Sequence, residues 1–149
     1  MAQFSRLLRR FASDESGVFA VIFGLMAIVL IALGDAVVDY VALEQTKTRA
    51  QTALDAAALA LQPRIFAPGF DENDAADLRA LGDLAEAIMV ERIGDARVTG
   101  GIPDGGITAN VVDGSLYFRA GFTMPTTFVS LVGVRTLSAE VQSEATRKK

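Results

Sequence analysis

An uninterrupted run of apolar residues dominates the first quarter of the chain. From Gly17 to Gly34 no side chain is charged or carries an amide, and past Asp35 the apolar character continues to Val38. A bilayer core about 30 Å thick needs roughly 20 apolar residues in helical conformation. A buried core helix usually keeps one polar face, which this run lacks. We therefore predict a transmembrane helix over residues 17–38.

A cleavable secretory signal is the alternative interpretation of this run. Such signals have an apolar region of about 7–15 residues that ends at a small-residue cleavage site. The run here is longer, and Gly34-Asp35-Ala36 matches such a site poorly. A retained anchor in contact with the lipid bilayer is therefore favoured.

The charges on either side of the run predict its orientation. Residues 1–16 contain an excess of arginine, whereas acidic residues follow the run. Basic flanks favour the cytoplasmic side of a membrane. We therefore expect residues 1–16 to form a basic cytoplasmic N-terminus and the chain after the run to lie outside the cytoplasm. The arginines are Arg6, Arg9 and Arg10.

Two aspartates lie at the outer end of the run. Asp35 and Asp39 are four residues apart, and Tyr40 follows the second. An ionisable side chain at membrane depth is a functional candidate by default. We expect both carboxylates to reach the interfacial water, and the alternative is pairing with a cation on a partner helix. Asp35, Asp39 and Tyr40 are therefore candidate contacts where the helix leaves the membrane.

The helical pattern continues beyond the membrane. No proline occurs between Val18 and Gln62, and Pro63 follows as a stop signal. We predict that residues 39–62 continue the helix and present one face to the outer domain; packing on a neighbouring subunit is the alternative. Residues at spacings of three and four mark this face. They are Leu43, Ala50, Leu54, Ala57 and Leu61, together with Lys47.

Residues 63–149 have the pattern of a small mixed domain. Acidic capping residues at Asp71–Asp74 precede a helical periodicity that ends before Gly94, which predicts a helix from Asn73 to Ile93. The period then becomes two, as in half-buried strands. We expect a loop at residues 100–106, strands at 107–112, 116–124 and 137–145, a turn at Asp113-Gly114 and a short helix at 128–133.

These elements predict an α+β fold, in which a long N-terminal helix and a second helix accompany a small antiparallel sheet. The alternation along the strands points one set of side chains toward the helices. We expect Phe118, Phe122 and Phe128 to lie in the core.

Composition excludes several classes of function. The net charge is −4, and the acidic outer part lacks the basic patch that nucleic-acid binding needs. The chain has no histidine and no cysteine, which removes the usual general base, the thiolate nucleophile and the commonest metal ligands. The acids at residues 71–77 lack the glycine-centred loop of a calcium-binding EF-hand. We therefore predict no enzyme activity, no cofactor and no metal site.

Three blocks in the N-terminal part resemble a known family. They are Ser16–Leu25, Val38-Asp39-Tyr40 and Ala53–Ala60. In this order they resemble the N-terminal segment of the TadE/TadG-like proteins of the Flp (tight-adherence) pilus, over about residues 10–62. The segment from Met124 to Ala145 is similar, more weakly, to the C-terminal part of these proteins. The chain is too short for the long extracytoplasmic domain of the larger members.

The resemblance implies a non-enzymatic, minor-pilin-like role in pilus assembly at a bacterial inner membrane. Its partners would be other pilin-like or pilus-assembly subunits, and its pilin-like sheet domain would be periplasmic or extracellular. In pilin-like relatives a prepilin peptidase cuts after a glycine that follows basic residues. Gly17 matches this glycine and Val18 the new first residue, whereas Ile22 replaces the usual glutamate. The alternative is an envelope-anchored binding or sensing module that stays outside the pilus.

Overall fold

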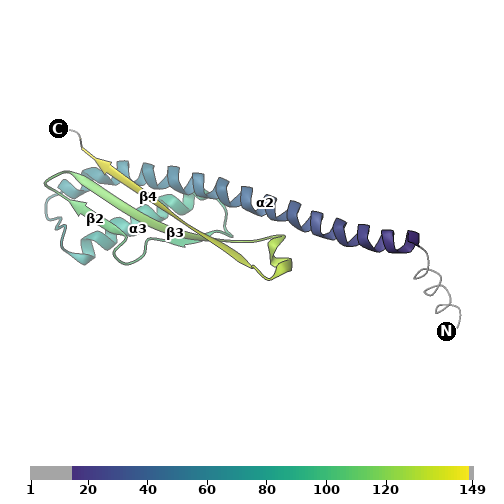
Figure 1. Ribbon diagram of the computed structural model, residues 1–149. Coiled ribbons are helices and arrows are strands. Elements are labelled where there is room, and N and C mark those ends of the chain that lie inside the picture. The colour runs from purple at the N-terminus through teal and green to yellow at the C-terminus, as the bar shows by residue number, and fades with distance from the viewer. Residues whose placement is uncertain (1–14, 148–149) are drawn as a thin grey trace. The chain divides into compact units, whose positions relative to one another are not determined.

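A computed structural model describes residues 15–147 of the protein (Figure 1). The chain divides into two compact units, residues 1–38 and residues 39–149. The predicted basic segment with Arg6, Arg9 and Arg10 lies outside the described residues, as do Lys148 and Lys149. The division of the chain into segments that end at residues 16, 38 and 62 remains a prediction.

The first described element is the long helix α2, Glu15–Leu61, which has 47 residues. It begins and ends close to the predicted limits because no helix-breaking proline occurs before Pro63. The chain then tightens into a 3-10 helix, η1 (Gln62–Phe66), which carries this proline in its first turn. Proline fits there because the first N–H groups of a helix have no intrahelical partner.

The second helix, α3 (Ala75–Ile93), has clear signals at both ends. The Asp74 carboxylate accepts a hydrogen bond of 2.9 Å from the N–H of Ala76. At the other end Gly94 adopts the left-handed conformation, with φ of 65°, and its N–H donates to the carbonyl of Val90. The helix therefore starts just after the predicted position because Asp74 acts as the cap outside it.

The sheet is antiparallel and centres on β3 (Ser115–Pro125). β4 (Thr136–Thr146) pairs with β3 along its whole length, from Ser115 opposite Thr146 to Pro125 opposite Thr136. The other edge of β3 is shared by β2 (Ile107–Asn110) and β1 (Thr99–Gly101). The expected α+β class with a small antiparallel sheet is confirmed.

The strand β1 corrects the prediction of a loop from Gly100 to Gly106. Gly100 lies opposite Phe122 of β3. A Cβ atom at Gly100 would lie 2.7 Å from the carbonyl oxygen of Gly121 and 2.9 Å from the Cβ of Phe122. The glycine therefore permits a close strand approach here, although glycine-rich composition usually indicates a loop.

One face of the sheet forms the core with the helices of the second unit (Figure 1). Alternate residues of β3 are buried, and the corresponding face of β4 is buried toward its end. The buried strand residues include Leu116, Phe118, Ala120, Phe122, Val141 and Ala145, and the buried residues of α3 include Leu81, Ala85, Met89 and Ile93.

The prediction that Phe128 belongs to this core was wrong. Phe118 and Phe122 are buried, but the side chain of Phe128 is 37% exposed. The alternating pattern ends with β3 at Pro125, and Phe128 precedes the 3-10 helix η2 (Val129–Val132) in the connection to β4. Strand periodicity therefore does not determine the direction of this side chain.

Candidate functional site

The apolar part of α2 is the first candidate surface. Of the residues that the structure describes, this is the one helix long and apolar enough to cross a membrane, and 6% of its most apolar window is buried. Its aromatic residues Phe19 and Phe23 are 77% and 76% exposed. A helix that is apolar on all sides needs an apolar environment. Length and composition therefore suit this segment to lipid.

The predicted processing position lies at the start of the same helix. Gly17 and Val18 belong to the first turn of α2, and the side chain of Val18 is 52% exposed. Ile22, which stands where pilin-like relatives carry glutamate, is 51% exposed. Cleavage after Gly17 would therefore leave α2 nearly intact, with Val18 as its first residue.

Asp39 occupies a site that the sequence did not suggest. Its side chain is buried, with 4% exposed. The N–H of Thr127 donates to Oδ1 at 3.1 Å, and the N–H groups of Phe128 and Val129 donate to Oδ2 at 2.9 and 2.8 Å. These bonds join α2 to the connection between β3 and β4, across 88–90 residues of sequence.

The hydrogen bonds also determine the charge state of Asp39. The N–H of Val129 contributes most to lowering the pKa of this carboxyl below its ordinary value. Burial opposes this effect, and the N–H groups of Thr127 and Phe128 reinforce it. The carboxylate is thus a stable anion that is satisfied by backbone donors.

We expected the carboxylate of Asp39 to reach interfacial water, but its side chain is buried. The other two predicted contact residues do not share this buried site. Asp35 is half-buried in the first unit, and the side chain of Tyr40 is 60% exposed. The turn after Pro125 needs an acceptor for its free N–H groups, but nothing local indicates which acid supplies it.

The predicted packing face of α2 lies against the sheet and α3. Ala50, Leu54 and Ala57 are completely buried, Leu61 is 4% exposed, and Leu43 is partly buried against the same core. Ala53 and Ala58 are also buried and widen this face beyond the predicted stripe. These residues share one core cluster with buried residues of β3, β4 and α3.

Polar contacts at the edge of this face hold the elements in register. The Nε2 group of Gln51 donates to the carbonyl of Gln142 in β4 at 2.6 Å. Near the end of α2, Gln62 donates to the carbonyl of Gly114 at 2.8 Å, and the N–H of Arg147 donates to the same oxygen. The helix is therefore bound to the sheet near the far end of β3 as well as at Asp39.

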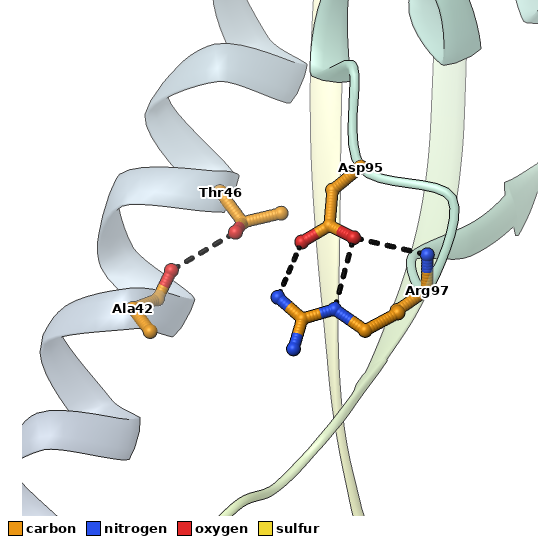
Figure 2. A network of polar contacts seen from close by, with 4 residues as sticks. All are labelled: Ala42, Thr46, Asp95 and Arg97. Carbon is orange, nitrogen blue, oxygen red and sulfur yellow. Dashed lines mark hydrogen bonds and ion pairs between the residues drawn. The ribbon is translucent and has the colours of Figure 1, made fainter.

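A second carboxylate with a lowered pKa fixes the turn between α3 and β1. Figure 2 shows Asp95 accepting from the guanidinium and from the N–H of Arg97. The side-chain hydrogen bond from Arg97 contributes most to lowering the pKa of Asp95 to about 2, with smaller contributions from the backbone N–H and from the charges of Arg97 and Arg49. Thr46 of α2, also drawn there, donates to the carbonyl of Ala42. Because both partners are solvent-accessible, the ion pair orders the turn and contributes little to stability.

The acidic cluster before α3 has a local structural use. Asp71 accepts from the N–H of Asn73, and the carboxylate of Asp77 accepts from the N–H of Asp71. Within residues 15–147 no group of three or more acidic side chains is arranged to hold a metal ion. The cluster thus satisfies backbone donors ahead of α3.

Comparison with known proteins identifies the N-terminal part of the chain. Residues 17–62 match the model of the putative Flp pilus-assembly TadE/G-like family. A comparison with curated proteins and with solved structures finds no match to the chain. The matched range includes the apolar part of α2, Asp39 and the packing face. The resemblance noted in the sequence is therefore confirmed over residues 17–62, which are similar to the putative Flp pilus-assembly TadE/G-like family.

Proposed function

We propose that this protein is a membrane-anchored, non-enzymatic component of Flp-type pilus assembly. The observation that carries the proposal is the apolar part of α2, which is uncharged, exposed on all sides and included in the family match. The protein would act through packing of α2 and through the second unit. The absence of histidine and cysteine from the sequence supports a role without catalysis.

The energetics of the apolar segment favour the membrane. Burying one large aliphatic or aromatic side chain stabilises a protein by about 1.5–3 kcal/mol. In water, almost every large apolar side chain between Val18 and Leu33 would stay exposed and would not contribute this stabilisation. Insertion into lipid recovers it, and the helical backbone satisfies its own hydrogen bonds there.

In the proposed topology, residues 1–16 are cytoplasmic and residues 17–38 span the inner membrane. Residues 39–62 continue the helix outside, and residues 63–149 form the outer α+β domain. Because the chain has no cysteine, single cysteines can report the two sides. We expect a membrane-impermeant maleimide to label Val112→Cys in intact spheroplasts. Ser5→Cys, made together with Gly17→Leu so that residues 1–17 are retained, should be labelled only after lysis. The opposite pattern would reverse the topology, and recovery of the protein in the soluble fraction would refute the anchor.

The finer proposal is a minor pilin that is processed between Gly17 and Val18. Its test is N-terminal sequencing of the protein from membranes and from sheared filaments. A start at Val18 would support pilin-type processing, and an intact Met1 would contradict it. Gly17→Leu should block this cut, whereas Gly24→Leu, which changes a glycine about two turns further along α2, should not.

The competing function is an envelope-anchored binding or sensing module. The two functions differ in where the protein is found and what it contacts. A pilus component should cross-link to pilin-like subunits or appear in sheared filaments, and its deletion should reduce piliation. Normal piliation after deletion, with the protein confined to the membrane, would favour the sensing module.

A further inference from the structure

The connection between β3 and β4 lies at the end of the hairpin (Figure 1), and several of its apolar side chains are exposed. We call residues 126–135 the β3–β4 tip. Leu131 is 82% exposed, Val134 is 42% exposed and Phe128 is 37% exposed. Arg135 is the single charged residue of this segment. An exposed group of this kind indicates a surface that meets an apolar partner.

The polar groups of the β3–β4 tip are largely satisfied within the protein. The N–H groups at its start donate to Asp39, and those of Leu131, Gly133 and Val134 donate to carbonyls of the tip itself. The hydroxyls of Thr126 and Ser130 also donate to carbonyls of the tip. A segment whose backbone is internally paired can enter a region of low polarity without leaving donors unsatisfied.

Asp39 places this tip at a defined point along the chain. It is the residue directly after Val38, where the apolar run ends. Three backbone hydrogen bonds to its carboxylate hold the start of the tip beside this residue. If the apolar run spans a bilayer, covalent continuity keeps Asp39, and with it the tip, close to the membrane surface.

We propose that the β3–β4 tip inserts Phe128, Leu131 and Val134 into the interface of the outer leaflet. The inference rests on the proposed membrane anchoring. Lipid is favoured over a protein partner because the tip is bound to Asp39, the residue that directly follows the apolar run in the sequence, and because Arg135 suits anionic headgroups. Apolar side chains with a cationic neighbour are typical of segments that lie at the headgroup boundary.

The opposite end of β3 offers a matched control. Val112 lies in the turn between β2 and β3 and is 78% exposed, close to the value for Leu131. β3 has 11 residues and therefore separates the two ends by about 34 Å. A bilayer contact at the tip should leave Val112 in water.

The test uses the full chain with a single cysteine at position 131, 112 or 28, each labelled with an environment-sensitive nitrobenzoxadiazole fluorophore. The three variants are Leu131→Cys, Val112→Cys and Ile28→Cys, all at exposed positions. Each is reconstituted into phosphatidylcholine–phosphatidylglycerol vesicles that contain a doxyl quencher near the headgroups or near the bilayer centre. We expect the shallow quencher to remove most of the fluorescence at 131 and little at 112, and the deep quencher to act most strongly at 28.

The outcomes separate this inference from the proposed function. Strong quenching at 28 with equal, weak quenching at 131 and 112 overturns the tip insertion and leaves the anchor standing. Absence of quenching at 28 overturns the anchor and the inference together. A blue-shifted but unquenched fluorophore at 131 indicates that protein, such as a second copy of the chain, covers the tip, and this also overturns the inference.

Discussion

Leu54 is completely buried where α2 packs on the core of the second unit, and its truncation should destabilise this unit. Leu54→Ala removes the side chain beyond Cβ, and each buried methylene or methyl group contributes about 0.8 kcal/mol. The neighbours Ala53, Ala57 and Ala58 are short and lie on the helix backbone, so they cannot fill the space. The cavity therefore adds to the transfer cost, and we expect a loss of about 3–4 kcal/mol in the free energy of unfolding.

Leu59 provides the matched control on the same helix. Its side chain is 70% exposed. Leu59→Ala has the same change in helix propensity as Leu54→Ala but creates no cavity. We expect its effect on the free energy of unfolding to stay within about 0.5 kcal/mol.

Pulse proteolysis of the full chain in urea and mild detergent measures this difference. Circular dichroism would be less informative because the apolar part of α2 stays helical in micelles. With a urea dependence of about 1–3 kcal/mol per M, Leu54→Ala should lower the unfolding midpoint by at least about 1 M. Equal midpoints for the Leu54 and Leu59 variants would refute the packing of α2 on the sheet.

Three further predictions concern the tip and the sheet edge. Asp39→Ala removes the acceptor of three N–H groups, so amide hydrogen exchange at residues 127–129 should accelerate, whereas Asp35→Ala, one helical turn earlier, should leave it unchanged. Because folding lowers the pKa of Asp39 below 3.8, its contribution to stability is complete above that value and lost as the pH falls through the lower folded pKa. Protection factors at 127–129 should therefore stay constant down to about pH 4 and fall below it; a loss near neutral pH would contradict the assignment. In the same urea assay Gly100→Ala should destabilise the protein by about 1–3 kcal/mol, because its Cβ would clash with a backbone carbonyl. Gly121→Ala should leave the stability unchanged, because a Cβ atom at this position meets open space. Equal unfolding midpoints for the Gly100 and Gly121 variants would argue against the close approach of β1 to β3.

The elements that depend on local pattern were predictable from the sequence. The uncharged run, the periodicity of α3 and the alternation along β3 and β4 each repeat over several turns or strand positions. The capping aspartate at residue 74 and the left-handed Gly94 act within a few residues of the helix ends. Such signals predict secondary structure because their physical cause lies within the same segment.

The tertiary structure alone decided the contacts that join distant segments. β1 is a strand because β3 lies close enough to pair with Gly100, although its own composition indicates a loop. Asp39 is buried because three N–H groups from the β3–β4 tip surround it, 88–90 residues away. The exposure of Phe128 follows from the same arrangement. The sequence by itself determined the apolar helix and the class of fold, whereas the hydrogen-bond partners of Asp39 depend on where folding places the β3–β4 tip.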